Sequence, residues 1–471
     1  MPEIGNVKEQ VTELFRKHHV EVPQDRKDLF NAFIRDNNTV AAIQAISELE
    51  NLLMANWKQQ DRIATIKGQS VRITNASVGK QYEAKLDFEQ LGWTDLAQWK
   101  FEGLEETGLT FEEEQKLISG KPALSGEVPL RFLFKLEGQA EDEPFNEKVI
   151  TLTINPDPKS LWKNLVSDKD DPYWKEDDIT VFEPLGDKYI LASSKRGRSH
   201  ANEGSFREDD FAFKSLENGW SIVAVSDGAG SARFSRKGSD IACRSIVQYF
   251  TEEDAVKSLQ EFDQILAQLK AKAAPDSPGK LNHFVYNTLG KAALTVHKKL
   301  EDFASKARHS LKELSCTLIF TLFKKYESGY AFLSFGVGDC PIAVLNKDLS
   351  EVKLLNWIDV GEFGGGTRFI TMPEIFRNEK FATRFSFKEI EDFSCLMLMS
   401  DGIYDPKFVV EANLEDVTKW KEFLEDLNGR NDSGVKVELD PGNKDIVQQF
   451  SAWMDFWSTG NHDDRTLAIV F

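Results

Sequence analysis

The stretch Ser221-Ile-Val-Ala-Val-Ser-Asp-Gly-Ala-Gly-Ser231 decides how the second half of this chain folds. Its apolar run, residues 222–225, is too short for a helix and fits a strand that is buried on both faces. The run ends abruptly in Asp227, and the glycines that follow let other groups approach the backbone closely. A carboxylate at the end of a rigid strand can present a fixed ligand to a metal or a phosphate. Taken alone, however, the stretch is more typical of a strand followed by an ordinary Asp-Gly turn.

The composition bounds the size and the partners of the protein. Its 471 residues are enough for two or three domains. The formal net charge is −19, with 77 Asp and Glu against 58 Lys and Arg and no long basic block, so we expect no nucleic-acid partner. The sequence has neither an apolar run that could span a membrane nor a signal-peptide pattern, so we expect a cytoplasmic protein without a membrane partner.

The cysteines favour packing over chemistry. They are widely spaced, form no paired metal-ligand motif, and lack the arginine six residues downstream that a cysteine-nucleophile phosphatase needs. Buried apolar positions are therefore expected for them. The four are Cys243, Cys316, Cys340 and Cys395.

Hydrophobic spacing changes along the chain and predicts four parts. Residues 1–60 carry apolar side chains at helical spacing, with Pro23 separating two helices. Residues 61–155 alternate in the manner of strands. Residues 156–185 are rich in proline and charge, and we expect a linker whose aromatic side chains dock on a neighbouring domain. Residues 186–471 interleave strands with two helical blocks, which predicts an α+β layered domain. The docking aromatics are Trp162, Tyr173 and Trp174.

Within the strand-rich part, Gly108-Leu-Thr-Phe111 and Ile118-Ser-Gly-Lys-Pro122 are followed by Gly126. This pattern resembles the immunoglobulin-like or cadherin-like repeats of many bacterial proteins. The resemblance implies an all-β sandwich over residues 61–155. Its role is open between recognition of a partner and a structural spacer. Such modules are usually extracellular, which differs from the cytoplasmic location expected here.

Four strands of residues 186–471 end in, or begin beside, acidic residues. Asp227-Gly228 and Asp401-Gly402 each follow an apolar run and a serine, while Glu208-Asp209 and Asp463-Asp464 each precede a strand. Carboxylates clustered at strand ends repel one another unless cations lie between them. A site for hard divalent ions explains the set, because magnesium and manganese prefer oxygen ligands.

In this order, the motifs resemble the metal-dependent protein phosphatases of the protein phosphatase 2C type, in a bacterial branch. The similarity covers about residues 186–471, and several motifs in family order make it specific. It implies an α-β-β-α layered sandwich. The matching stretches are Ser199-His-Ala-Asn-Glu-Gly204, Asp227-Gly-Ala-Gly-Ser-Ala232, Gly361-Glu-Phe363, Thr367-Arg-Phe-Ile-Thr371 and Asp463-Asp-Arg-Thr466.

The resemblance also implies a set of metal ligands. Asp227 would bridge two divalent ions, manganese or magnesium, and the carbonyl of Gly228 would bind one of them directly or through water. Asp209 would act on the side of the first ion, and Asp401 and Asp463 would hold the second. The bridging water would become hydroxide near neutral pH and attack a phosphomonoester in line, without a covalent enzyme intermediate.

Three more acidic residues have implied auxiliary roles. Asp339 matches the residue that family members use for a third, weaker metal. Glu208 and Asp464 are expected to orient waters or metal ligands. Beside the site, the glycine-rich residues 361–371 are expected to form a mobile flap, with an ordinary glycine-rich turn as the alternative.

Two positions depart from the eukaryotic relatives. Their phosphate-binding arginine corresponds to Gly204 here, so Arg198 or Arg207 is the candidate phosphate ligand. The histidine that they carry after Asp-Gly corresponds to Ala229. His200 is therefore a candidate general acid for the leaving alkoxide, with a structural role as the alternative.

We therefore expect a bacterial phosphatase that hydrolyses phosphoserine and phosphothreonine on proteins. Residues 1–160 would recruit or position a partner, and a cognate Ser/Thr kinase or its targets is a reasonable partner for this branch. One alternative is an inactive phosphatase-like module that binds phosphoproteins or scaffolds a kinase, although the retained Asp227 and Asp401 favour activity. Another keeps the enzyme but makes its target a small phosphorylated molecule.

Overall fold

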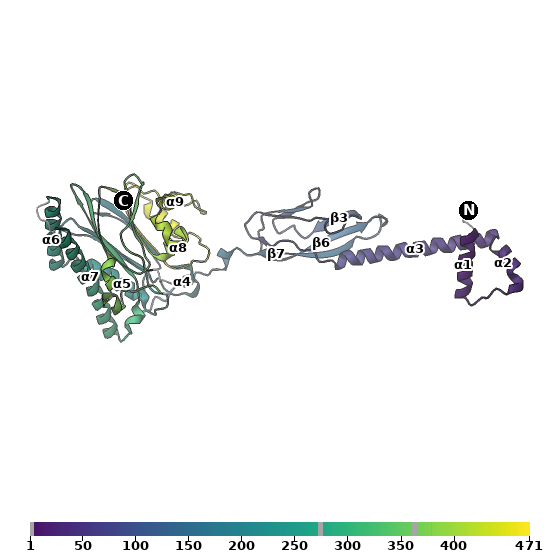
Figure 1. Cartoon of the computed structure of the whole chain (residues 1–471), viewed down its shortest axis with the longest axis horizontal. Coiled ribbons are helices and arrows are strands. Elements are labelled where there is room, and N and C mark those ends of the chain that lie inside the picture. The colour runs from purple at the N-terminus through teal and green to yellow at the C-terminus, as the bar shows by residue number, and fades with distance from the viewer. Residues whose placement is uncertain (1–3, 272–276, 360–365, 378) are drawn as a thin grey trace. The chain divides into compact units, whose positions relative to one another are not determined.

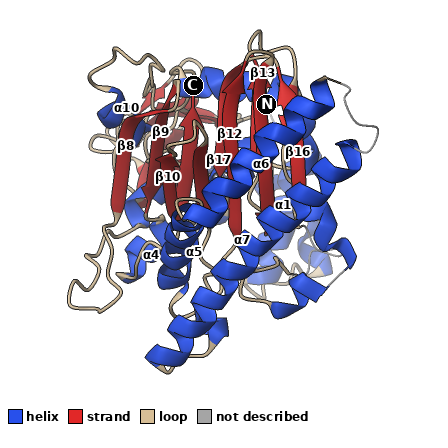
Figure 2. Ribbon diagram, turned by 90° about the vertical axis from the view of Figure 1, so that its left-hand side faces the viewer, coloured by secondary structure: helices blue, strands red, loops and turns tan. Residues whose placement is uncertain are grey.

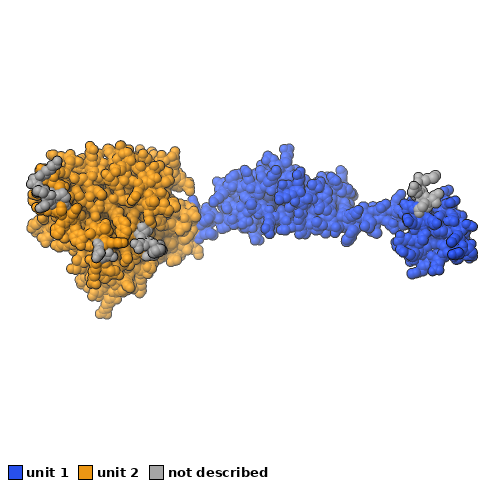
Figure 3. Space-filling model, viewed as in Figure 1, with its two compact units in different colours: residues 1–161 blue, residues 162–471 orange. Residues whose placement is uncertain are grey.

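The computed structural model describes residues 4–271, 277–359, 366–377 and 379–471. The chain divides into two compact units, residues 1–161 and residues 162–471, which Figure 3 colours separately. Within the described ranges, we find no helix that combines the length and the apolar character needed to cross a bilayer.

The first unit begins with helices (Figure 1). They are α1 (Ile4–Lys17), the short 3-10 turn η1 (Gln24–Arg26) after Pro23, α2 (Lys27–Phe33) and α3 (Asn37–Gly68). Asp36 caps α3, because its carboxylate accepts hydrogen bonds from the backbone N–H groups of Asn38 and Thr39. The expected boundary at residue 60 lies inside α3, which continues because Ile63 and Ile66 pack into the core of the strands that follow.

Two sheets around one core form the rest of the first unit. One sheet has the strand order β1-β7-β6-β3 and the other β2-β5-β4. Trp93 stacks on Phe132 in the shared core, with ring centroids 4.7 Å apart. The expected β-sandwich is present, and its immunoglobulin-like character stays a prediction. The elements are β1 (Ala76–Ser77), β2 (Tyr82–Lys85), β3 (Leu96–Glu102), β4 (Leu109–Glu112), β5 (Leu117–Gly120), β6 (Gly126–Leu136), β7 (Asn146–Asn155) and the turn η2 (Pro158–Leu161).

Gly108 and Gly120, both part of the quoted strand-rich pattern, allow a close backbone crossing. Both adopt positive φ, of 78° and 135°. A Cβ on Gly108 would lie 2.5 Å from the carbonyl oxygen of Lys121, and one on Gly120 would lie 2.6 Å from that of Gly108. Glycine is therefore required at both positions.

The second unit contains two antiparallel sheets (Figure 2). In spatial order, the first has β10 (Asp210–Ser215), β11 (Ser221–Ser226), β12 (Leu318–Tyr326), β13 (Gly329–Val337) and β16 (Phe385–Ile390). The second has β15 (Val352–Leu354), β14 (Ile342–Asn346), β17 (Phe393–Met399), β18 (Arg465–Val470), β9 (Lys188–Lys195) and β8 (Asp178–Leu185). Strand β11 is buried on both faces, as its apolar run predicts: Val223 and Val225 face the second sheet, whereas Ile222 and Ala224 pack under helices.

Helices cover the outer face of each sheet, so the layers run helix, sheet, sheet, helix. Figure 2 shows α6 and α7 crossing the first sheet. The helices on the first sheet are α5 (Ser235–Tyr249), α6 (Glu253–Lys270) and α7 (Ser277–Ala307). Those on the second are α8 (Asp401–Phe408), α9 (Val417–Leu427) and α10 (Ile446–Trp453). The short elements are α4 (Arg198–Glu203), η3 (Leu311–Leu314), η4 (Pro373–Arg377), η5 (Glu379–Arg384) and η6 (Glu411–Glu415).

Residues 156–185, expected to be a linker, contain strand β8 and a segment that packs within the second unit. Strand β8 forms an edge of the second sheet. We call residues 162–177 the strap, because they pack on the rest of the second unit. The ring centroid of Trp162 is 4.4 Å from that of His462, and the hydroxyl of Tyr173 is 3.0 Å from Nε2 of His309.

Candidate metal centre

Strand pairing brings the predicted metal ligands to the same end of the two sheets. Asp209 precedes β10 and Asp227 follows β11, and these strands pair with Asp210 opposite Ser226. Asp401 follows β17 and Asp463 precedes β18, and those strands are also antiparallel neighbours. The ends of both pairs meet because the two sheets pack face to face.

The electrostatics indicate that the four carboxylates share one site. Burial raises the pKa of Asp227 well above its usual value, and the charges of Asp401, Asp209 and Asp463 raise it further. The pKa of Asp209 rises to about 7, first because of burial and then because of nearby carboxylates. Such mutual repulsion is what a cation between carboxylates relieves.

The donor set fits a hard divalent ion, since every predicted ligand is an oxygen. Oδ1 of Asp401 is buried and has no hydrogen-bond partner among the described residues. A buried carboxylate oxygen without a partner is costly, and a cation would satisfy it.

Cys340 is not needed as a ligand: its sulfur lies close to Asp227 and Asp339, but burial raises its pKa well above the usual value. It is one of four buried free cysteines, as expected for packing positions.

Close packing at two glycines holds the loops of the site together. A Cβ at Gly228 would lie 2.7 Å from the carbonyl oxygen of Glu208. A Cβ at Gly402 would overlap the carbonyl oxygen of Asp464. Each Asp-Gly pair therefore needs its glycine so that the neighbouring acidic loop can approach.

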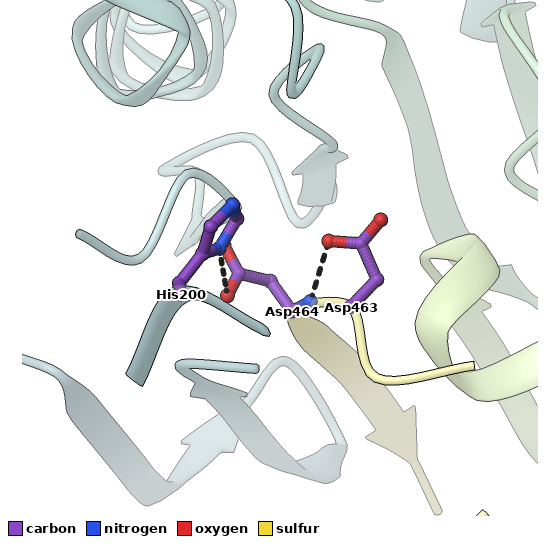
Figure 4. Close-up of side chains that lie close together, drawn as sticks. All are labelled: His200, Asp463 and Asp464. Carbon is purple, nitrogen blue, oxygen red and sulfur yellow. Dashed lines mark hydrogen bonds and ion pairs between the residues drawn. The ribbon is translucent and has the colours of Figure 1, made fainter. Parts of the chain in front are cut away.

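Asp464 organises one side of the site (Figure 4). Its Oδ1 accepts hydrogen bonds from the backbone N–H of Gly197 at 2.6 Å and from Nδ1 of His200 at 2.9 Å, and its Oδ2 accepts one from the backbone N–H of Glu208. These contacts hold the pKa of Asp464 below its usual value although burial acts in the opposite direction. The expected role of Asp464, to orient waters or metal ligands, stays a prediction.

Carboxylates surround the ring of His200. Its Nε2 lies 3.9 Å from Oε2 of Glu208, so both ring nitrogens face acidic groups. Burial lowers the pKa of His200, but the hydrogen bond to Asp464 and the nearby negative charges outweigh it and raise the pKa to about 9. For Glu208, burial raises the pKa to about 7. Figure 4 shows the ring of His200 directed at Asp464, with Asp463 on the far side of Asp464.

Asp339 lies at the edge of the site. Its Oδ2 accepts a hydrogen bond from the hydroxyl of Thr367 at 2.6 Å, and its side-chain oxygen lies within 4.8 Å of a ligand atom of Asp227. The pKa of Asp339 is raised, chiefly by burial. Of the expected flap, residues 361–365 lie outside the described residues.

The two candidate phosphate ligands are held by protein groups. Arg207 is fully buried and donates to the carbonyl oxygens of Glu176 at 2.9 Å and Asp209 at 2.5 Å, and to the hydroxyl of Ser194 at 2.6 Å. Its burial leaves no surface for a substrate phosphate, so Arg207 is a positioning group for Asp209 and the expected phosphate role is corrected. Arg198 is bound to a carboxylate oxygen and the carbonyl oxygen of Asp455, and its phosphate role stays a prediction.

The structure adds a residue that sequence reasoning missed. Lys175, in the strap, is 14% exposed, and its Nζ donates to the carbonyl oxygen of Asp209 at 2.6 Å, to Oδ2 of Asp210 at 3.2 Å and to the hydroxyl of Ser239 at 3.3 Å. Lys175 and Arg207 therefore hold the same carbonyl of Asp209 from two directions. A lysine in a proline-rich stretch carries no motif, so only the fold reveals this role.

The profile of the family described as Protein phosphatase 2C matches residues 196–439. No curated protein matches. Among solved structures, a bacterial serine phosphatase is 14% identical and covers 60% of this chain and 96% of its own, with a TM-score of 0.36. Serine/threonine phosphatase Stp1 from Staphylococcus aureus is 12% identical (62% of this chain, 96% of its own, TM-score 0.33). The catalytic domain of the phosphatase PstP in complex with 2 manganese ions is 14% identical and covers 60% of this chain and 96% of its own, with a TM-score of 0.33.

Proposed function

Because this chain belongs to the protein phosphatase 2C family, and is thereby a metal-dependent protein phosphatase, we propose that the carboxylates at its strand ends form the active site. The substrates of this family are phosphoproteins, and the proposed reaction is hydrolysis of phosphoserine and phosphothreonine. The observation that carries the proposal is the gathering of repelling acidic side chains around an unpartnered buried oxygen of Asp401.

In this proposal, Asp227, Asp209, Asp401 and Asp463 hold two divalent ions, manganese or magnesium, with the Gly228 carbonyl as a further ligand. Asp339 serves a third, weaker ion. When bound, the ions supply an acidified water for in-line attack and positive charge for the leaving oxygen. Asp463 is exposed and Asp209 buried, so the site is open on the side from which a phosphoprotein loop could enter.

The remaining residues position this machinery. Asp464 fixes the backbone at Gly197 and Glu208, which keeps the acidic loop before β10 in register with the one before β18. His200 holds a proton on Nδ1 against Asp464 and faces Glu208 with Nε2. This geometry supports an orienting role for His200 more directly than a role as the acid that protonates the leaving group.

Residues 1–161 form a unit of their own, and we propose that they recruit or position the phosphoprotein partner, with a cognate Ser/Thr kinase or its targets as the first choice. An inactive phosphoprotein-binding module is disfavoured because all four ligand carboxylates are retained.

Hydrolysis of a phenyl phosphate ester and of phosphopeptides with manganese, compared between wild type and Asp401→Asn, tests the proposal. Loss of at least about 100-fold in kcat is expected for this variant, because a removed ligand forfeits transition-state stabilisation. Asp392→Asn is the matched control: Asp392 precedes the other end of β17 and pairs with Lys188 at 3.6 Å, so its activity should equal wild type.

Equal turnover by Asp401→Asn and wild type would show that the carboxylate cluster is not the catalytic centre. Tight binding of phosphopeptides without turnover in excess manganese would establish the binding module instead. Faster hydrolysis of small phosphorylated metabolites than of phosphopeptides would move the substrate class and leave the site assignment intact.

A further inference from the structure

The middle of α3 receives no packing from the described residues. Its N-terminal part packs through Ile43 in one small core, and its C-terminal part through Ile63 and Ile66 in the core of the sandwich. Between them, every side chain from residue 48 to residue 58 is exposed. At 1.5 Å per residue this is about 16 Å of bare helix. Because helices in proteins gain most of their stability from packing an apolar face, three bare turns are unusual.

One face of these bare turns is apolar. At 100° per residue, four large side chains lie within an arc of about 140°. They form the α3 patch: Leu49, Leu52, Leu53 and Trp57, which are 64%, 57%, 69% and 65% exposed. Asn56 and Gln60 lie on the same arc and are uncharged, whereas Glu48, Lys58 and Asp61 lie outside it. Glu50 lies about 20° beyond the Trp57 edge of the arc, so the helix presents an apolar stripe whose charges lie at its margins or on the opposite face.

We propose that the α3 patch is a dimer interface whose occupant is the α3 patch of a second copy of this chain. The spacing of the four apolar residues, i, i+3, i+4 and i+8, is that of a helix seam that takes side chains from a facing helix. Asn56 on the seam fixes register, as single polar residues do in paired helices. A twofold pair uses the same surface on both copies, which is the commonest arrangement for soluble dimers.

The area and the charge of the patch support this occupant. Three leucines and a tryptophan at these exposures leave roughly 500 Å² per copy, so two copies bury about 1,000 Å² in all, the lower limit for a specific interface. The patch itself is neutral, so two copies can meet there although each chain carries a net charge of −19. A membrane surface fits less well, because helices that lie on membranes are rich in Lys and Arg. Residues 48–62 carry Glu48, Glu50 and Asp61 against Lys58 and Arg62.

Sedimentation of the full chain over about 1–100 µM tests the proposal, because dimers dissociate on dilution by mass action. Wild type should approach the dimer mass with rising concentration. The double variant Leu49→Glu/Leu53→Glu should stay monomeric, since facing carboxylates would repel. The matched control is Met54→Glu: Met54 is 53% exposed but lies outside the arc, so this variant should dimerise like wild type.

Cross-linking gives a second readout that does not depend on shape. Leu53 lies at the centre of the patch, so Leu53 of one copy faces Leu53 of the other whether the helices run parallel or antiparallel. The native cysteines are buried, so a thiol placed at this position is accessible on its own. With diamide as oxidant, two thiols of Leu53→Cys should join in one disulfide while the diamide is reduced, and Met54→Cys should not cross-link.

A monomer at every concentration, with no cross-link at position 53, would overturn the proposal. So would equal cross-linking at positions 53 and 54, which is what random collision produces. A patch covered by the same chain's second unit would appear as a monomer whose sedimentation coefficient falls in the Leu49→Glu/Leu53→Glu variant, and this would also exclude the second copy. Mass and cross-linking are independent of phosphatase activity, so the outcome stands whatever the fate of the proposed function.

Discussion

Replacing Lys175 with methionine should weaken both the second unit and its metal site. Methionine keeps the length and removes the charge. The carbonyl of Asp209 then loses the hydrogen bond at 2.6 Å, and the carboxylate of Asp210 loses the one at 3.2 Å. Asp210, whose side chain is 15% exposed, keeps Arg207 as a cation, but at 3.9 Å. This largely buried aspartate is thus left with one distant cation and with the hydrogen bond from the backbone N–H of Phe211 at 3.0 Å.

The magnitude follows from these contacts. Removing one partner of a buried ion pair costs about 3–5 kcal/mol of unfolding free energy, and the remaining arginine favours the lower end, about 3 kcal/mol. For residues 162–471, an entropy of unfolding of about 2.1 cal/mol/K per residue converts each kcal/mol into a shift of about 1.5 °C in Tm. A fall of about 4–5 °C is therefore expected. Lys175→Met with Asp210→Asn removes both charges and should recover most of the loss.

Two measurements separate stability from positioning. Thermal unfolding with a chelator present reports Tm, and calorimetric titration with manganese reports metal affinity. The double variant should regain Tm but still bind manganese more weakly, because the carbonyl of Asp209 stays unanchored on that side. Lys188→Met is the matched control: Lys188 is also 14% exposed and bonds Asp392 and the carbonyl of Phe393, away from the site, so it should lower Tm only. Wild-type manganese affinity in Lys175→Met would refute the positioning argument.

Three more predictions concern single residues. In the absence of metal, Asp401→Asn should raise Tm, because burial and neighbouring carboxylates raise the pKa of Asp401 and the amide removes that repulsion; a lower Tm in chelator would contradict the shared site. Gly402→Ala should cost about 3 kcal/mol or more in urea unfolding, because its Cβ would overlap the backbone of Asp464, which cannot move as a flexible side chain would. The hydrogen bond from Arg62 holds the pKa of Asp95 in the folded protein below 3.8. The stabilisation that this ion pair gives to the folded state is therefore fully present above pH 3.8 and is lost as the pH falls through the folded-state pKa. Asp95→Asn should then lower the stability of the first unit at pH 7, by less than about 1 kcal/mol because the pair is about one-third exposed, and the difference from wild type should shrink as the pH falls below 3.8.

Local sequence patterns predicted those parts of the site that depend only on neighbouring residues. The apolar runs before Asp227 and Asp401 predict buried strands that end in a carboxylate, and both strands are present. The layered fold of the second unit also follows from the order of strand and helix patterns. Antiparallel pairing explains why the carboxylates of paired strands lie close together. In each pair, the beginning of one strand lies beside the end of its neighbour.

The roles of Arg207 and Lys175 depend on contacts between residues that are far apart in the sequence. Arg207 precedes the acidic pair in sequence and looked available for phosphate, yet its side chain turns inward because Ser194 and the carbonyls of Glu176 and Asp209 accept its protons. Lys175 looked like part of a linker, yet the strap brings it under the same carbonyl. Neither role leaves a local pattern, since hydrogen bonds between distant segments depend on backbone groups whose positions no motif encodes.

By itself, the sequence determined most strands and helices of residues 186–471 and which acidic residues lie next to the strand ends, because these properties depend on hydrophobic period and on turn chemistry within a few residues. The tertiary structure decided which charges meet. It set the raised pKa values at the carboxylate cluster, the inward arginine and lysine that hold Asp209, and the bare apolar face of α3. Burial and electrostatic coupling act through space, so they become fixed only when segments far apart along the chain are packed together.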